Sequence, residues 1–116
     1  MKTACFFHYN GPGRVSIARF APRNIPPGYR VFKALAPGPW FKSVDRAEYE
    51  RLYFAQLALL NATDVADQLI KLAHPYEPVL LCWEQADACR KGENWCHRHM
   101  VAAWLKREIN LDVSEL

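Results

Sequence analysis

The sequence has no long apolar run and no N-terminal segment of the secretory kind. Its longest apolar stretches, such as PVLLCW and LALL, are far shorter than the roughly 18 to 20 residues that cross a bilayer. The start, MKTACFFHYN, holds a short apolar run that polar residues interrupt, and an A-x-A-like cleavage site is missing. We therefore expect no membrane span and a cytoplasmic location.

Acidic residues are missing from the N-terminal third of the chain. Residues 1–42 hold seven of the 15 Lys and Arg side chains and no Asp or Glu, and the first acidic residue is Asp45. Residues 43–116 hold the other eight basic side chains and all 12 acidic ones. This asymmetry predicts that the N-terminal third faces an anion, such as phosphate or nucleic acid. A solvated basic surface is the alternative explanation.

The composition is that of one ordinary globular domain. The chain has 116 residues, of which 51% are hydrophobic and 23% are charged, and a chain of this size can bury one real core. We find no internal repeat and no low-complexity segment, so residues 1–116 are expected to form a single domain. In a reducing compartment, the four cysteines are better explained as thiols or ligands than as disulfides.

The hydrophobic pattern predicts strands over 3–9, 15–20 and 78–83. The last of these, PVLLCW, is continuously apolar, which is typical of a central parallel strand that is buried on both faces. Residues 29–36 can be a short strand or a turn within a Pro-rich irregular stretch. Residues 111–116 can add a final short strand.

Three amphipathic helices are predicted between and after these strands. The first is expected to start at Ser43, as N-cap, with Asp45 in its first turn. The second starts at Thr63 and ends at His74, before Pro75. The third follows Asn94, as N-cap, and has Met100, Val101, Trp104 and Leu105 on its apolar face. This order predicts an α/β fold: a small, mostly parallel sheet flanked by helices in a single three-layer domain.

Side chains of the types that take part in catalysis and anion binding are concentrated in the stretch ENWCHRHM, residues 93–100. If Asn94 caps the helix, then Cys96, His97 and Arg98 lie in its first turn, where the helix end attracts anions and lowers the pKa of a thiol. The planar guanidinium of Arg98 can donate paired hydrogen bonds to a phosphate or a carboxylate. His99 is two positions from His97, so the two rings point to different sides of the helix, and His99 has no assigned role.

A carboxylate, Glu84, directly follows the apolar strand 78–83. Ligands of an open α/β sheet bind outside the carboxyl ends of the strands, and this places Glu84 near the helix that starts at Cys96. We therefore predict an anion-binding pocket that holds a reactive thiol and a carboxylate. Two alternatives stay open: Cys96 can be an inert packed thiol, and Glu84 can be a structural ion-pair partner.

A metal centre is not expected. Cys82, Cys89 and Cys96 recur every seven residues with His97 beside the last, which is nominally a zinc ligand set. The spacing differs from the close C-x₂₋₄-C pairs of structural zinc sites, so we predict no metal and no cofactor.

Four segments together resemble the domain-of-unknown-function family 488. LLCWE and CHRHMVAAWL resemble its C-x-E and C-H-R signature, while SIARFAPR and KALAP resemble its S-I-A-R and L-A-P elements upstream. The resemblance covers nearly the whole chain. The positions that match are Arg19, Pro22, Leu35, Pro37, Cys82, Glu84, Cys96, His97 and Arg98. It implies a small cytosolic α/β domain, supplies no reaction, and makes Arg19 part of one signature with Glu84, Cys96 and Arg98.

The function expected from these observations is the binding of a phosphorylated ligand, either a nucleotide or a nucleic-acid end. Arg19 and Arg98 would hold phosphate. Glu84 would be general base or nucleophile, and Cys96 would be a thiolate or a hydrogen-bonding partner. His97 and Cys82 are further candidate ligand-binding residues. The sequence leaves open whether the protein is an enzyme; if it is one, we expect a transferase or hydrolase that acts on a nucleotide-like substrate. The oligomeric state is also left open. The alternatives are a non-catalytic nucleic-acid-binding module and an adaptor for a partner protein.

Overall fold

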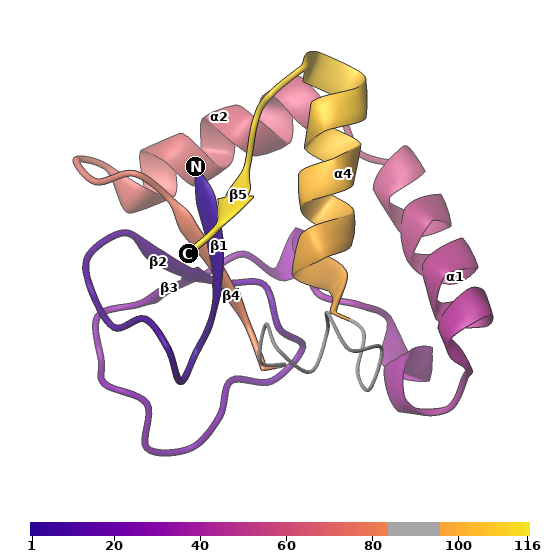
Figure 1. The fold of residues 1–116 in the computed structure, drawn as a ribbon, viewed down its shortest axis with the longest axis horizontal. Coiled ribbons are helices and arrows are strands. Elements are labelled where there is room, and N and C mark those ends of the chain that lie inside the picture. The colour runs from indigo at the N-terminus through magenta and orange to yellow at the C-terminus, as the bar shows by residue number, and fades with distance from the viewer. Residues whose placement is uncertain (84–95) are drawn as a thin grey trace.

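The structure, a computed structural model, describes residues 1–83 and 96–116 (Figure 1). The strands are β1 (Lys2–Cys5), β2 (Arg14–Ser16), β3 (Arg30–Val31), β4 (Val79–Cys82) and β5 (Ser114–Glu115). The helices are α1 (Arg46–Ala58), α2 (Ala62–Ala73) and α4 (His97–Ile109), with single 3₁₀ turns η1 (Lys33–Leu35) and η2 (Pro39–Lys42).

The five described strands form one sheet in the order β3-β2-β4-β1-β5, and every pair of neighbours is parallel. The central strand, β4, is buried along its whole length. In the register, Leu80 lies opposite Thr3 of β1 and Val15 of β2, and Cys82 lies opposite Cys5. The prediction of a small parallel α/β domain with PVLLCW at its centre is confirmed.

The sheet separates two apolar clusters that differ in what covers them. Because residues in register point to the same side of a parallel sheet, Val15 and Leu80 share one face. This face packs on the helices, in a cluster that includes Tyr53, Leu69 and Trp104. The opposite face is covered by irregular segments, in a cluster made of Ala4, Phe6, Ala18, Val79 and Leu81 with Tyr9, Ala21 and Ile25 against it. One outer layer is therefore helical and the other irregular.

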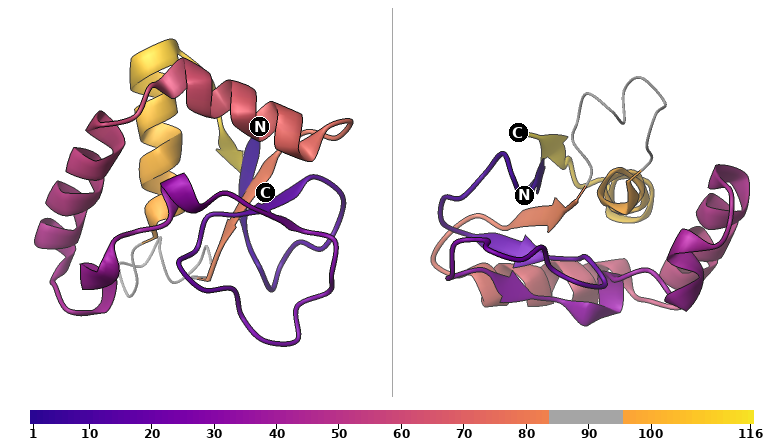
Figure 2. Two further views of the ribbon diagram at one scale, coloured as in Figure 1. Left: turned by 180° about the vertical axis from the view of Figure 1, so that it is seen from behind. Right: turned by 90° about the horizontal axis from the view of Figure 1, so that it is seen from below.

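Two of the described helices, α2 and α4, lie against the sheet, and α1 lies beside α4 and farther from the strands, as Figures 1 and 2 show. α2 packs against β2, α4 packs against β1 and β4, and α1 packs against α4 on the outer side. None of the helices in the described ranges has both the length and the apolar character that a bilayer crossing needs.

Two helix starts differ from the predicted ones, because a neighbouring side chain supplies the cap in each case. α1 is capped by Asp45, whose Oδ1 accepts from the N–H of Glu48 at 2.9 Å, and Ser43 instead ends the 3₁₀ turn η2. α2 is capped by Asn61, not Thr63, through a bond to the N–H of Asp64. A carboxylate or amide oxygen satisfies a backbone donor of the first turn in both cases.

Helix α4 begins two positions later than the predicted cap at Asn94 implies. Cys96 is its N-cap residue, with extended backbone angles, and His97 is the first helical residue. The predicted cap, Asn94, lies outside the described residues. The apolar face of the helix, which includes Val101 and Trp104, is buried as predicted.

The parallel arrangement gathers the carboxyl ends of the strands at one edge of the sheet. At this edge, Arg19 follows β2 and Lys33 follows β3. The start of α4 also lies there, because the side chain of Arg98 reaches Cys82, the last residue of β4. The residues predicted to form the site and described by the structure therefore lie along one edge of the sheet.

Candidate functional site

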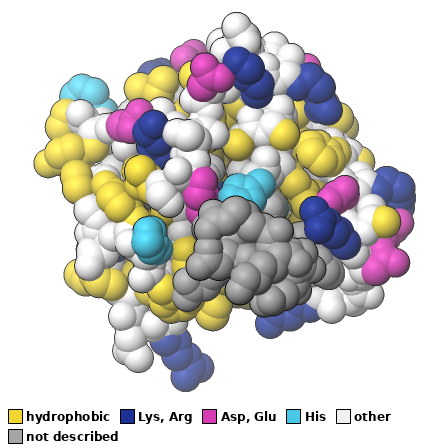
Figure 3. Space-filling model, viewed as in Figure 1, with side chains coloured by type: hydrophobic (Ala, Val, Ile, Leu, Met, Phe, Trp, Pro, Cys, Tyr) yellow, Lys and Arg dark blue, Asp and Glu magenta, His cyan; other side chains and the backbone are white. Residues whose placement is uncertain are grey.

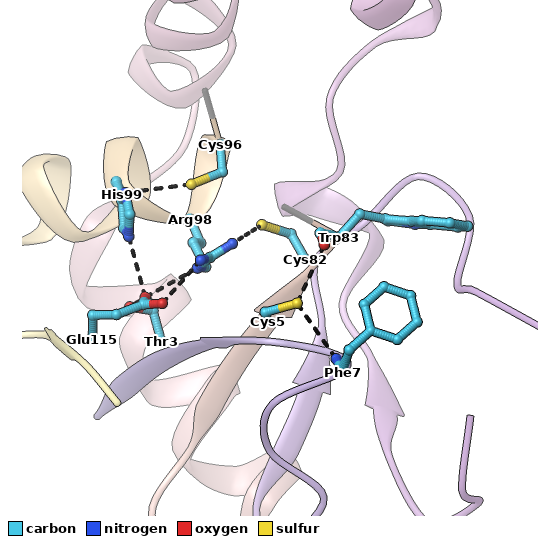
Figure 4. A network of polar contacts seen from close by, with 9 residues as sticks. All are labelled: Thr3, Cys5, Phe7, Cys82, Trp83, Cys96, Arg98, His99 and Glu115. Atoms are coloured by element: carbon cyan, nitrogen blue, oxygen red, sulfur yellow. Dashed lines mark hydrogen bonds and ion pairs between the residues drawn. The ribbon is translucent and has the colours of Figure 1, made fainter. Parts of the chain in front are cut away.

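Arg98 lies at the centre of a polar network that joins α4 to two strands (Figure 4). Its side chain is fully buried. Nε and Nη2 donate to the two carboxylate oxygens of Glu115 at 3.0 and 2.9 Å, and Nη1 donates to Sγ of Cys82 at 2.9 Å. The guanidinium of Arg98, which was predicted to bind a ligand anion, thus binds a carboxylate of the protein itself.

Glu115 accepts from three side chains, and these bonds keep it charged. Besides the bonds from Arg98, its Oε1 accepts from Oγ1 of Thr3 at 2.7 Å and lies 3.2 Å from Nε2 of His99. Burial raises the pKa of Glu115, but the bonds from His99, Arg98 and Thr3 outweigh burial and hold this pKa well below its usual range. Glu115 is therefore a fixed negative charge within the network.

His97 is fully enclosed and neutral. Its Nε2 lies 2.6 Å from the carbonyl oxygen of Ile17, and because a carbonyl only accepts, Nε2 carries the hydrogen. The ring meets that of Tyr53 edge to face, with centroids 5.4 Å apart. Burial lowers the pKa of His97 to about 4, with the bond to Ile17 opposing this shift and the charge of Arg98 adding to it. His97 thus ties the start of α4 to the residue that follows β2.

Cys96 forms a second branch of the network, which the sequence did not predict. Its Sγ lies 3.3 Å from Nδ1 of His99, and the other ring nitrogen of His99 faces Glu115. Figure 4 shows the thiol, the imidazole and the carboxylate in this order. The spacing of three between Cys96 and His99 is a sequence signal for this contact, since residues three apart are neighbours on a helix surface. Glu115 carries no comparable signal.

The cysteines described by the structure, Cys5, Cys82 and Cys96, are present as thiols. Cys5 lies beside Cys82 in the sheet, and its Sγ donates to the carbonyl oxygen of Trp83 at 3.2 Å. Burial raises the pKa of Cys5, against the effects of a hydrogen bond from the N–H of Phe7 and the charge of Arg98. Within residues 1–83 and 96–116, no group of three or more His, Cys, Asp or Glu side chains is arranged to hold a metal ion.

Arg19 lies in a hollow of about 430 Å³ at the carboxyl edge of the sheet. Nη1 of Arg19 donates to the carbonyl oxygen of Pro37 at 3.3 Å, and Nζ of Lys33 donates to the carbonyl oxygen of Arg19 at 3.2 Å. Phe20 and Gln56 add an aromatic and an amide side chain to the lining, and none of the described lining residues is acidic. Two cationic side chains therefore share one open hollow.

Cys96 opens onto a different and smaller hollow, of about 210 Å³. This hollow lies between α1 and α4. It is lined by Arg46, Glu50 and Phe54 of α1 and by Cys96, His99 and Met100 at the other side. The structure thus brings Cys96, Arg98 and Cys82 into one network and places Arg19 in a separate hollow. Glu84 and Cys89 lie outside the described residues.

The charge asymmetry of the sequence does not produce a uniform basic surface on the face seen in Figure 3. There, Lys and Arg side chains are interspersed with Asp and Glu side chains over the helices. The local charge of the Arg19 hollow is therefore a better guide to a ligand than the charge of the N-terminal third as a whole.

Comparisons with protein-family models, with curated proteins and with solved structures give no match for this chain.

The buried ion pair predicts a large loss of stability when its carboxylate is removed. Replacing Glu115 with Ala leaves the guanidinium of Arg98 buried without its partner, and we expect the free energy of unfolding to fall by about 3–5 kcal/mol. Urea denaturation of the two proteins measures the difference. The control is Asp112→Ala, which removes the exposed ion pair with Lys106 and should leave the unfolding midpoint nearly unchanged. Equal losses in both variants would contradict a central role for Arg98.

The neutral state of His97 predicts a specific pH dependence of stability. The unfolded chain protonates this imidazole near pH 6.5, whereas the folded protein does so only near pH 4. Stability due to His97 is therefore complete above pH 6.5 and declines as the pH falls toward 4, by about 2 kcal/mol between pH 6.5 and 5.

Urea denaturation at pH 7.5 and pH 5 checks this prediction. In His97→Asn, which keeps a donor but cannot be protonated in this range, the decline should be smaller by that amount. His8→Gln, at an exposed position, should decline like the wild type. An unchanged slope in His97→Asn would show that His97 is not the residue responsible.

Proposed function

We propose that the protein binds a phosphorylated ligand with a planar ring, of the nucleotide kind, in the hollow that contains Arg19 and Lys33. The observation that carries the proposal is the presence of two cationic side chains, without a described acidic one, in a hollow of about 430 Å³ at the carboxyl edge of a parallel sheet. Ligands of open α/β sheets bind at this edge. The hollow is also within the size range of small-molecule sites.

The two cationic side chains suit a phosphate in different ways. A guanidinium has five N–H donors, so the bond from Arg19 to Pro37 leaves donors for two phosphate oxygens. The ammonium group of Lys33 adds a mobile point charge at the rim. Arg98, by contrast, is buried against Glu115, so the proposal gives the phosphate to Arg19 and Lys33.

An exposed aromatic ring beside the hollow supports the planar part of the ligand. The side chain of Phe20 is 63% exposed, and the guanidinium of Arg19 lies 5.7 Å from the centre of its ring. Nε1 of Trp83 donates to the carbonyl oxygen of Phe20 at 2.5 Å, which fixes the backbone there. A base could stack on Phe20 while its phosphate meets Arg19.

The catalytic part of the sequence-based hypothesis also remains a proposal. It assigns proton transfer or nucleophilic attack to Glu84, outside the described residues, and a thiolate to Cys96. A cytoplasmic location, which would keep the thiols reduced, and membership in the domain-of-unknown-function family 488 belong to the same proposal. Two of the motifs that support this membership contain residues of the network: Cys82 lies in one, and Cys96 and Arg98 lie in the other.

A non-catalytic nucleic-acid-binding role is the second candidate, and exposed aromatic rings favour it. Phe7 and Trp83 are 56% and 45% exposed, and their rings meet edge to face with centroids 6.2 Å apart. Phe20 is close to Trp83 through the hydrogen bond already described. Rings of this kind beside cationic side chains bind successive bases of a single strand.

The proposed function predicts that nucleotide binding depends on both cations of the hollow. Isothermal titration calorimetry with adenosine monophosphate should show weakening by roughly 10- to 100-fold in Arg19→Gln and in Lys33→Gln, since each change removes a charge-assisted hydrogen bond. Arg23→Gln is the matched control, because Arg23 is exposed on the same segment and outside the described lining of the hollow. Undiminished binding in Arg19→Gln would refute the proposal.

A single-stranded oligonucleotide distinguishes the two candidates. A nucleotide site should bind the monophosphate and the oligonucleotide with similar affinity. A nucleic-acid surface should bind the oligonucleotide much more tightly, lose affinity steeply with salt, and weaken in Phe7→Ala, a residue that does not line the hollow.

A further inference from the structure

We propose that Cys96, His99 and Glu115 form a nucleophilic thiol site that hydrolyses small esters through an acyl-cysteine intermediate. The site is separate from the Arg19 hollow, and the inference does not depend on the proposed function. It rests on two contacts, Cys96 Sγ to His99 Nδ1 at 3.3 Å and His99 Nε2 to Glu115 Oε1 at 3.2 Å. This chemistry requires a nucleophile, a base beside it, and a third group that orients the base. Here these are Cys96, His99 and Glu115.

The carboxylate determines which nitrogen of His99 can act as the base. Because Glu115 is ionised, it only accepts hydrogen bonds, and the facing Nε2 of a neutral His99 must carry the hydrogen. Nδ1 is then the unprotonated nitrogen, and it faces Sγ of Cys96. The tautomer that the network imposes is therefore the one that can take a proton from the thiol.

Glu115 is suited to orient the imidazole because other bonds hold it in place. Two bonds from Arg98 and one from Thr3 fix both oxygens of the carboxylate. These bonds keep the pKa of Glu115 well below its usual range although burial raises it, so this carboxylate does not take the proton from His99. Glu115 is a positioning residue, and its negative charge stabilises the imidazolium that forms.

The hollow between α1 and α4 gives a small substrate access to the thiol. Cys96 is largely buried, whereas the side chain of His99 is 41% exposed, and both line the hollow of about 210 Å³. Phe54, Met100 and Ala103 supply apolar walls. A volume of this size fits a short acyl group rather than a nucleotide.

The first half of the reaction transfers the acyl group to the protein. The proton of Cys96 moves to Nδ1 of His99 as Sγ attacks the carbonyl carbon of the ester. The S–C bond forms, the C–O bond to the alcohol breaks, and the alcohol leaves with the proton from His99. Cys96 occupies the N-cap position of α4, where the positive end of the helix dipole stabilises negative charge that develops near Sγ.

The second half uses water and restores the thiol. His99 accepts a proton from a water molecule as its oxygen attacks the acyl carbon. The C–S bond breaks, Sγ takes the proton from His99, and the carboxylic acid leaves. Ester and water are thus converted to acid and alcohol, with no other reactant.

The experiment is hydrolysis of p-nitrophenyl acetate by the full chain, followed by peptide mapping after acid quenching. Trypsin cleaves after Lys91 and Arg98 and so separates Cys96 from the other cysteines. We expect a burst of nitrophenol, continued turnover, and an acetyl group on the Cys96 peptide. Because Cys82 is compared in the same folded protein, the assay needs no variant. Acetylation of Cys82 or Cys5 at the same rate as Cys96 would overturn the proposal.

Variants then test the roles within the site. Cys96→Ser should remove the burst, and His99→Ala should slow acylation on the order of 10²- to 10⁴-fold. His99→Ala should also change the pH profile of the rate, because the base that takes the proton is gone. His8→Gln, at an exposed histidine outside the network, is the control that should keep the full rate. An unchanged rate and pH profile in His99→Ala would exclude His99 as the base.

The result separates this proposal from the one for Arg19. Arg19→Gln with Lys33→Gln should keep acetylation of Cys96 while nucleotide binding is lost. Conversely, Cys96→Ser should still bind the nucleotide. Failure of one prediction therefore leaves the other to be judged by its own assay.

Discussion

The ion pair between Arg98 and Glu115 is the interaction on which the candidate site depends. It joins the first turn of α4 to β5. The guanidinium also donates a hydrogen bond to Cys82, and this bond joins α4 to the end of β4. A fully buried guanidinium is tolerated only when its donors are satisfied. The same carboxylate that satisfies Arg98 also faces His99. Structure and reactivity at the start of α4 therefore rest on one charged group near the C-terminal end of the chain.

Two cationic regions with different surroundings follow from this arrangement. Arg98 is enclosed and matched by a carboxylate, while Arg19 and Lys33 lie in an open hollow whose described lining has no acidic residue. Coulomb attraction to a ligand is strong only where a charge is not already compensated. This difference explains why the sequence, which shows only residue types, placed Arg19 and Arg98 in the same role.

Apolar patterns predicted the fold well, because the spacing of apolar residues in each segment reflects which positions are buried in the folded protein. PVLLCW lies at the centre of the sheet, and the stripe with Val101 and Trp104 faces the core. Helix caps at Asp45 and Asn61 were missed because several neighbouring side chains are suitable caps and only the local geometry selects one. Glu115 was missed for another reason: its partners lie 16 and more residues away in the chain and meet it only in the folded domain.

The strand order also constrains how the domain can assemble. Both sheet partners of β1 among the described strands, β4 and β5, come from the last 40 or so residues of the chain. β2 and β3, by contrast, pair with each other across a short separation. The first strand of the chain therefore has no strand beside it until β4 is in place, and the thiols of Cys5 and Cys82 become neighbours only at that step. The polar network next to them therefore joins segments that are far apart in the chain, and contacts of this kind carry a loop-closure cost in entropy.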